Sequence, residues 1–127
     1  LVMLDLDKFK TINDTLGHEV GDRVLQLFGA VLRDQRRSSD LAARMGGEEF
    51  ALLLPHTDAA TAMLIEQRLR NALKAACAAQ PQLAVHYSAG LAVQDARDAT
   101  LSAFMVRADD ALYRAKDQGR GRLQTAD

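Results

Sequence analysis

The sequence predicts an α+β fold in which helices pack on a mainly antiparallel sheet. Short apolar strand-like runs and longer segments with helical spacing of apolar residues follow one another in the order βααββαβαβ. Two of the strand-like runs are broken by the pair Gly46-Gly47, which is typical of an antiparallel hairpin. The chain has 127 residues, 48% of them hydrophobic, which suits one domain with a single core.

The first half of the chain opens with a strand-like run over residues 1–6. Every position before Asp5 is apolar, and we expect this strand in the middle of the sheet, because both of its faces would be buried. A short helix is predicted over residues 8–16 and ends at Gly17. A longer helix is predicted to begin at Asp22, and its inward stripe consists of Val24, Leu25, Phe28, Val31 and Leu32.

The remaining elements are delimited by prolines and glycines. The hairpin strands are predicted over residues 40–45 and 49–54, and Pro55 ends the second. Pro81 and Gly119 each end a helical segment. The elements predicted after the hairpin are a helix over 58–78, a strand within 83–93, a helix over 100–117 and a strand over 122–125.

Composition limits the class of partner and the compartment. The formal net charge is −1, which argues against a protein that binds DNA or RNA, although a small phosphorylated ligand needs only a few local cations. Cys77 is the only cysteine, so no intramolecular disulfide can form and a cytoplasmic location fits. No apolar run approaches the roughly 20 residues that span a bilayer, and no signal peptide opens the chain.

Two aspartates lie at the end of the first predicted strand. Asp5 and Asp7 alternate with Leu6 and therefore point to the same side of the chain. Carboxylates next to a buried strand are unfavourable unless another group satisfies them. One interpretation is a turn in which Asp7 caps the helix that follows. The other is a magnesium site, because Mg²⁺ prefers one or two carboxylates with waters and phosphate oxygens. Taken alone, the two aspartates favour the cap.

The predicted hairpin carries two glutamates at its tip. Gly46 and Gly47 fit a turn without any functional role, because glycine tolerates positive φ. In a two-residue turn Arg44 would lie across from Glu49 as a structural pair. A tip beside the first strand would also bring Glu48 within reach of Asp5. Carboxylates from two strands that hold a divalent metal are typical of phosphoryl-transfer sites.

Further polar residues occur between positions 10 and 22 and near the end of the last helix. Asp22 could simply cap a helix and His18 could be an ordinary loop residue. However, Asn13 and Asp22 together suit guanine, because a carboxylate accepts from its N1–H and amine while an amide meets O6. The cations near the end of the last helix, Lys116 and Arg120, could stabilise that helix end or bind phosphate oxygens.

The joint spacing of these groups carries more information than any one motif. In chain order they are Asp5-Leu6-Asp7, Phe9-Lys10, Ile12-Asn13-Asp14, Gly17-His18, Gly21-Asp22, Arg44-Met45-Gly46-Gly47-Glu48-Glu49-Phe50, Ala108-Asp109, Ala111-Leu112-Tyr113 and Ala115-Lys116. This series resembles the GGDEF family of diguanylate cyclases over almost the whole chain. The resemblance implies an adenylyl-cyclase-like, ferredoxin-related sheet. It also implies a bacterial second-messenger enzyme that condenses two GTP into cyclic di-GMP and two pyrophosphate, with one GTP on each subunit of a homodimer.

The resemblance also implies a metal centre and a base. Asp5, the backbone carbonyl of Leu6 and Glu48 would hold Mg²⁺ or Mn²⁺. Glu48 would in addition take the proton from the 3′-hydroxyl that attacks, and Glu49 would support the metal site. The substrate contacts that it implies are Asn13 and Asp22 for guanine, His18 nearby, Gly47 for close backbone approach, and Lys10, Lys116 and Arg120 for the phosphate charge of the transition state.

A candidate inhibitory site precedes the hairpin. The segment Arg37-Ser38-Ser39-Asp40 stands where the family places the RxxD motif that binds its product, cyclic di-GMP, and Arg44 could assist. The resemblance therefore implies product feedback, and an arginine can bind guanine O6 and N7 with two hydrogen bonds. The alternative is structural, with Arg37 near a helix end and Asp40 at the start of a strand.

Two features depart from the family pattern. The family's opening helix is missing, and Gly119-Arg120-Gly121 replaces the usual Gly-Arg-Asn. We therefore expect residues 1–127 to be one GGDEF domain of a longer protein with a sensory domain, whose membrane attachment stays open. Two rival interpretations are a catalytically silent domain that only binds a guanine nucleotide or cyclic di-GMP, and an unrelated interaction module. The intact tip favours an active cyclase.

Overall fold

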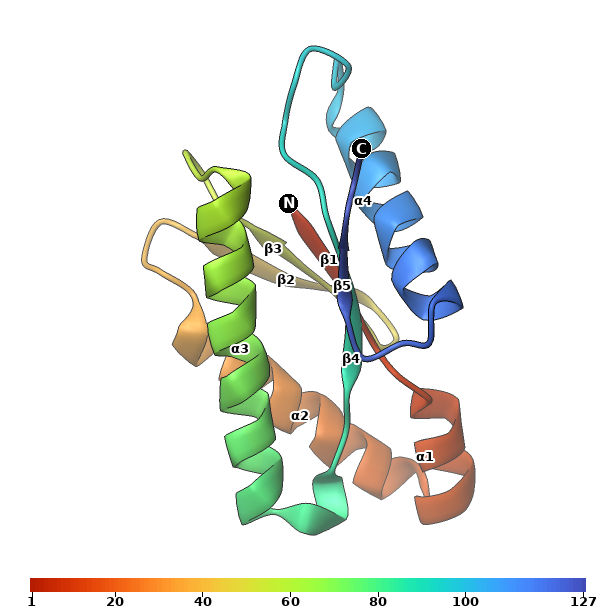
Figure 1. Cartoon of the computed structure of the whole chain (residues 1–127). Helices are drawn as coiled ribbons and strands as arrows, with labels where there is room; N and C mark the ends of the chain where they lie inside the picture. Colours follow the sequence, from red (N-terminus) through yellow and green to blue (C-terminus); the bar gives the residue numbers. More distant parts are fainter.

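A five-stranded sheet runs through the middle of the molecule, and the structure, a computed structural model, describes residues 1–127 (Figure 1). The strands are β1 (Val2–Leu6), β2 (Leu41–Gly46), β3 (Glu49–Leu53), β4 (Tyr87–Leu91) and β5 (Leu123–Thr125). The helices are α1 (Phe9–Leu16), α2 (His18–Gln35), α3 (Ala59–Ala79), the 3₁₀ helix η1 (Pro81–Leu83) and α4 (Leu101–Asp117). The predicted α+β class and the order βααββαβαβ are therefore confirmed.

The sheet has the strand order β2-β3-β1-β4-β5. All neighbours are antiparallel except β4 and β5, which are parallel. As expected from its apolar sequence, β1 is the central strand, and all five of its residues are buried. The hairpin of β2 and β3 lies on one side of β1, and β4 lies on the other. A site at the end of β1 can therefore include residues from the hairpin and from β4.

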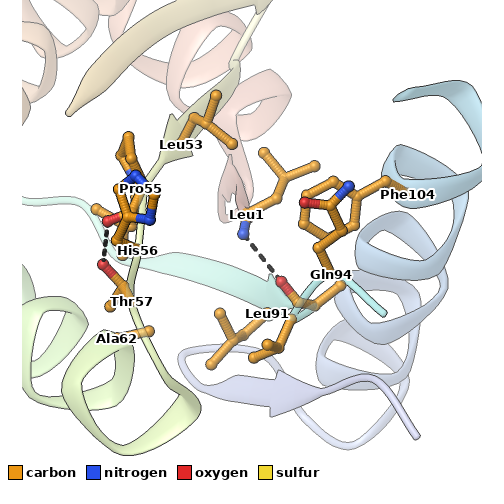
Figure 2. Close-up of a pocket in the computed structure, with 12 residues that line it drawn as sticks. Leu1, Leu53, Pro55, His56, Thr57, Ala62, Leu91, Gln94 and Phe104 are labelled. Carbon is orange, nitrogen blue, oxygen red and sulfur yellow. Dashed lines mark hydrogen bonds between the residues drawn. The ribbon is translucent and has the colours of Figure 1, made fainter. Parts of the chain in front are cut away.

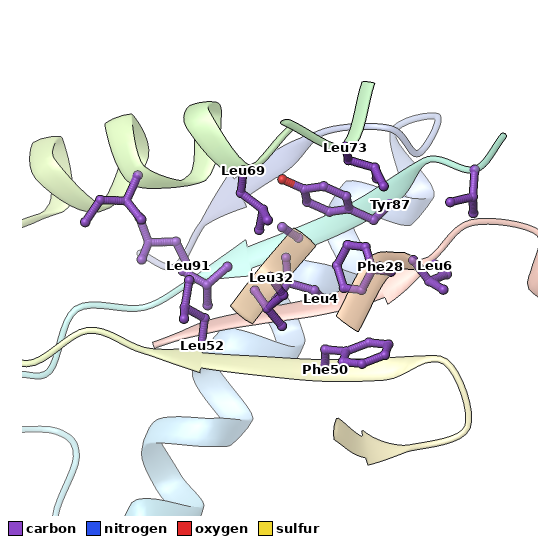
Figure 3. Close-up of a cluster of buried hydrophobic side chains, with 14 of the residues drawn as sticks. Leu4, Leu6, Phe28, Leu32, Phe50, Leu52, Leu69, Leu73, Tyr87 and Leu91 are labelled. Atoms are coloured by element: carbon purple, nitrogen blue, oxygen red, sulfur yellow. The ribbon is translucent and has the colours of Figure 1, made fainter. Parts of the chain in front are cut away.

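Helices cover both faces of the sheet. Figure 1 shows α2 and α3 on one face and α4 on the other. Because side chains alternate along a strand, Val2, Leu4 and Leu6 enter the larger core below α2 and α3, which Figure 3 shows. Phe28 of α2 lies at its centre, with its ring 4.8 Å from that of Phe50. Met3 faces the opposite way, into a smaller core under α4, and Asp5 follows on that same side.

The last helix approaches the sheet closely at one glycine. A Cβ atom placed on Gly90 of β4 would lie 2.1 Å from the carbonyl oxygen of Ala108 and 2.3 Å from the backbone nitrogen of Leu112. Only a residue without a side chain allows this contact. Helix α4 is therefore seated directly on β4, which fixes where its last turn lies relative to the end of β1.

The prediction that the second helix begins at Asp22 is wrong. Helix α2 begins at His18, one turn earlier, and only Gly17 separates it from α1. Gly17 has a φ of 91°, so the chain changes direction within one residue. Asp22 thus lies inside the helix, and its interpretation as a cap is contradicted. None of the four α-helices has the length and apolar composition of a membrane span.

The hairpin differs from its predicted register. Gly46 pairs with Glu49, and Arg44 pairs with Phe50, because the register shifts between Arg44 and Gly46. The predicted pairing of Arg44 with Glu49 is therefore wrong, and a bulge at Met45 is the physical reason. The turn consists of Gly47 and Glu48, which places Glu48 at the outermost point of the hairpin beside β1.

Candidate active site

The centre of the site is Asp5, a buried carboxylate on the central strand. Its residue is 6% exposed and its side chain faces α4. The ammonium group of Lys116, on the last turn of α4, forms an ion pair and hydrogen bond with Asp5 Oδ2. The two residues are 111 positions apart in the sequence, and the seating of α4 on β4 is what brings them together.

The hairpin tip adds a second carboxylate. The backbone N–H of Leu6 donates to the carbonyl oxygen of Glu48 at 3.2 Å, which ties the tip to the end of β1. Burial raises the pKa of Asp5, Lys116 acts against this rise, and the negative charges of Glu48 and Asp7 add to it. The hairpin tip that carries Glu48 therefore lies beside the end of β1, where Asp5 is located.

The third carboxylate, Asp7, has a structural role that the sequence did not indicate. Its Oδ1 accepts a hydrogen bond of 2.6 Å from the hydroxyl of Ser88, and its Oδ2 accepts one of 2.9 Å from the backbone N–H of Gly121. The predicted cap is wrong, because α1 follows Lys8 and has no side-chain cap. Asp7 instead holds the loop after α4 against β4, and this loop carries Arg120.

The donors at the end of β1 fit a hard divalent cation. Asp5, Glu48 and the carbonyl oxygen of Leu6 are all oxygen ligands of the kind that Mg²⁺ and Mn²⁺ prefer. The ammonium of Lys116 already lies against Asp5, so this position favours positive charge. No cluster of three or more His, Cys, Asp or Glu side chains at metal-binding spacing is present. The remaining ligands of such an ion would be waters or phosphate oxygens.

The residues predicted to read guanine lie beside the junction of α1 and α2. Asn13 of α1 rests on Gly21 of α2, since a Cβ atom on Gly21 would lie 1.8 Å from the side-chain oxygen of Asn13. Asp22 is the next residue, is exposed, and lines a groove of about 550 Å³ between α2 and β2 that Arg44 also lines. His18, at the start of α2, is exposed as well.

The cations predicted to meet phosphate come from three elements. Lys10 is exposed on α1, Lys116 lies on the last turn of α4, and Arg120 is exposed in the loop that Asp7 holds. Arg120 has a φ of 65°, between two glycines that also have positive φ. Lys116 is the one of the three with an ion-pair partner, Asp5. Gly47, predicted to allow close approach of a nucleotide, has a φ of 52° and open space where a side chain would be.

The predicted inhibitory residues separate into two places. Arg37 Nη2 donates to Asp40 Oδ1 at 2.9 Å and to the hydroxyl of Thr57 at 2.7 Å. Burial by itself would raise the pKa of Asp40, but the hydrogen bonds and charge of Arg37 outweigh it and lower that pKa. Arg44 instead donates to the carbonyl oxygen of Gly47 at 2.9 Å, so it belongs to the hairpin tip and not to the Arg37–Asp40 pair.

A hollow of about 450 Å³ lies at the other end of the sheet, next to the inhibitory pair (Figure 2). Its walls are mainly apolar and include Leu53, Leu91 and Phe104. Thr57, which contacts Arg37, also lines it and donates to the carbonyl oxygen of Pro55 at 2.8 Å. None of the residues predicted to hold metal or substrate lies here, so the hollow is separate from the site around Asp5.

Sequence analysis missed a buried polar network below α3. The hydroxyl of Tyr87 donates to Glu66 at 2.9 Å, and Arg70 pairs with the same Glu66 oxygen at 2.6 Å. Arg70 also lies over the Tyr87 ring, 4.2 Å from its centroid. Burial and then the charge of Glu66 raise the pKa of Tyr87. The i,i+4 spacing of Glu66 and Arg70 could have indicated an ion pair on one helix face. Their contact with Tyr87 on β4 leaves no pattern in the sequence.

Comparison with known proteins points to one family. The family model described as "Diguanylate cyclase, GGDEF domain" matches residues 1–122. The chain is 45% identical to diguanylate cyclase DgcP of Pseudomonas aeruginosa over 130 residues, which covers 99% of this chain and 19% of that protein. It is 41% identical to diguanylate cyclase DgcM of Escherichia coli over 127 residues, with 99% of this chain and 30% of that protein covered. The chain thus spans less than a third of either relative.

One solved structure is similar to this chain in both fold and sequence. The GGDEF domain of DgcB from Caulobacter crescentus, in complex with c-di-GMP, superposes with a TM-score of 0.88 and 32% identity. This match covers 98% of the present chain and 75% of that one. The family model covers residues 1–122 and the named relatives are 41–45% identical, so the chain belongs to the GGDEF family of diguanylate cyclases.

Proposed function

We propose that this domain is a diguanylate cyclase that joins two GTP molecules into cyclic di-GMP and releases two pyrophosphates. The observation that carries the proposal is the pair of Asp5 and Lys116 at the end of β1, to which the backbone of Glu48 at the hairpin tip is hydrogen-bonded. Two carboxylates and a cation at one point suit a reaction in which a hydroxyl loses a proton while phosphate charge builds up. The names of DgcP and DgcM, both diguanylate cyclases, support the same activity.

Each bond-forming step joins the 3′-oxygen of one GTP to the α-phosphorus of the other and breaks the bond to pyrophosphate. Glu48 accepts the proton of the 3′-hydroxyl, and Glu49 supports the metal site. A divalent ion held by Asp5, Glu48 and the Leu6 carbonyl would supply positive charge at the reacting phosphate. Because the product contains two guanosines, two domains face each other as a homodimer and the step occurs twice.

The other residues bind and orient the substrate. Asn13 and Asp22 hydrogen-bond the guanine, with His18 at the edge of the same site, and adenine would leave these polar groups unpaired. Gly47 offers its backbone without a side chain in the way. The three cations that meet the triphosphate and the leaving pyrophosphate are Lys10, Lys116 and Arg120.

The test is incubation of the purified protein with GTP and Mg²⁺, followed by chromatographic separation of the nucleotides. Cyclic di-GMP should accumulate with the parent. Glu48→Gln keeps the shape of the side chain but removes its charge, so the rate should fall by about 100-fold or more with a nearly unchanged melting temperature. Absence of product from a protein that binds GTP would instead support a silent nucleotide-binding domain.

We also propose that Arg37 and Asp40 form a site at which cyclic di-GMP inhibits the enzyme. Arg37 is held in place by hydrogen bonds to Asp40 and Thr57, and 38% of its side chain is exposed. This pair precedes β2, whose far end leads to the catalytic tip. Arg37→Ala, in a protein able to dimerise, should keep making product at concentrations that stop the parent. Equal product plateaus for both proteins, with no product binding by calorimetry, would refute the inhibitory role.

A further inference from the structure

The carboxylate proposed to hold a divalent ion is already neutralised by a side chain of the same chain. The Lys116 ammonium pairs with Oδ2 of Asp5, and 34% of the Lys116 side chain is exposed against 8% for that of Asp5. The Lys116 side chain is therefore partly in contact with solvent, while the carboxylate that it pairs with is buried. Its long side chain can leave Asp5 by rotation about its own bonds without any movement of the backbone.

No second cation supports Asp5. Neither Lys10 nor Arg120 makes an ion pair, and Glu48 and Asp7 bring further negative charge to the same place. An ammonium group and a divalent cation repel each other strongly at the distances that one carboxylate would impose. A metal ion that binds Asp5 must consequently displace Lys116 or share Asp5 with it at a large electrostatic penalty.

We propose that Lys116 is an exchangeable counter-ion. It pairs with Asp5 before substrate arrives, and it leaves for the phosphate oxygens when metal and nucleotide enter together. This inference rests on the proposed function for the identity of the site. Metal alone would expel the lysine into solvent, whereas metal with a triphosphate gives the lysine a new partner. Lys116 thereby couples the binding of the two ligands, and each raises the affinity for the other by the same factor.

The coupling has a consequence for the order of binding. A domain that already neutralises its metal carboxylate discriminates against free divalent ions and admits them as metal–nucleotide complexes. A purely structural ion pair predicts the opposite response to mutation, because loss of the lysine would disturb the end of β1 and weaken metal binding. The two roles of Lys116 are therefore separated by the sign of the change in metal affinity.

The experiment measures the Kd for Mn²⁺ alone, by electron paramagnetic resonance of the free ion, in the parent and in Lys116→Gln. The variant should bind Mn²⁺ about tenfold more tightly, within the usual range of coupling between two sites. A GTP analogue with an α,β-methylene bridge, which cannot react, should raise Mn²⁺ affinity in the parent and do so much less in the variant. Arg114→Gln is the control, since Arg114 lies on the same helix but pairs with Asp127. It should behave as the parent does.

Equal or weaker Mn²⁺ binding by Lys116→Gln overturns the inference. Asp5→Asn separates that result from failure of the proposed metal site. If Asp5→Asn binds Mn²⁺ as the parent does, or if no protein binds it, Asp5 is no metal ligand and both proposals about this residue fail. If Asp5→Asn loses the ion while Lys116→Gln is unchanged, only the counter-ion role fails. Tighter binding by Lys116→Gln supports that role even when no cyclic di-GMP forms.

The parent protein allows a second measurement that needs no variant to fold. The Lys116 ammonium can be followed by nitrogen-15 NMR of the side chain. It should be hydrogen-bonded without added ligands and should change environment when Mg²⁺ and the α,β-methylene analogue are added together. A signal that stays unchanged on saturation with both ligands would show that the lysine does not move, and would refute the exchange.

Discussion

Replacement of Gly21 by alanine tests how the first two helices position Asn13, the side chain that we propose binds guanine. A Cβ atom at this position would lie 1.8 Å from the Asn13 side-chain oxygen and 3.3 Å from the ring of Phe9. The first contact is impossible, but its partner is the end of a flexible side chain, which can rotate away. Gly21→Ala should therefore keep the fold and displace Asn13 from its place.

The magnitudes of the two effects differ enough to be separated. Alanine in a helix interior gains about 1 kcal/mol over glycine, and a strained rotamer at Asn13 costs about 0.5–1.5 kcal/mol. Their sum leaves the free energy of unfolding nearly unchanged. Loss of the proposed hydrogen bond from Asn13 to guanine, with its partner left unpaired, would cost about 1–3 kcal/mol. GTP should then bind about 5- to 150-fold more weakly.

Gly29→Ala is the matched control. It lies on the same helix, about 12 Å further along, and a Cβ atom there meets nothing within 4 Å. This variant should gain about 0.5–1 kcal/mol of stability and keep the GTP affinity of the parent. Thermal melts and calorimetric titration with GTP on both proteins complete the test. Equal GTP affinity in the two variants, or unfolding of Gly21→Ala, would refute the reasoning about Asn13.

The remaining predictions concern packing, pH and base choice. Gly90→Ala should cost at least about 3 kcal/mol by denaturant unfolding, because its Cβ would meet the backbone of α4, and a stability equal to the parent's would show that α4 can shift. The pKa of Asp40 lies below its usual value, so its pair with Arg37 stabilises the fold above the unfolded pKa of about 4 and this contribution is lost as pH falls through the lower folded pKa. The difference in melting temperature between the parent and Arg37→Ala should accordingly shrink below about pH 4, and a constant difference would contradict the linkage. Asp22→Ala should weaken GTP binding and reduce its preference over ATP in competition experiments with little change in melting temperature, since Asp22 caps no helix; unchanged preference would remove it from base recognition.

Local signals in the sequence predicted most of the fold. The helix over residues 58–78 is α3 with Asp58 as its cap, whose carboxylate accepts from the backbone N–H of Thr61 at 2.7 Å. The strand over residues 1–6 is central, as its apolar positions before Asp5 on both faces predicted. The prediction of one helix start failed, because a residue that often caps helices lies inside the helix. Asp22 looked like a helix start, but the direction of the chain is set by Gly17 one turn earlier.

The site itself could be predicted only in outline. The position of the hairpin tip beside the end of the first strand followed from the hairpin pattern and is confirmed, while the contact of Glu48 with a metal ion on Asp5 stays a proposal. The partners of Asp7 depend on which strand lies next to β1 and on the loop after α4, neither of which leaves a local pattern. The pair of Lys116 with Asp5 depends likewise on the close packing at Gly90, which no spacing in the sequence reveals.

The central position of β1 has a consequence for how the chain folds during synthesis. Residues 2–6 leave the ribosome before either of their neighbours, and their partners on β4 are residues 87–91. Until those residues emerge, a mainly apolar strand has an open edge, which is the usual template for wrong pairing and aggregation. Contacts between such distant segments also make folding slow relative to a helical protein of this size. Nascent chains that stop before Leu91 should therefore depend on chaperones, whereas chains that extend past it can close the sheet on both sides of β1.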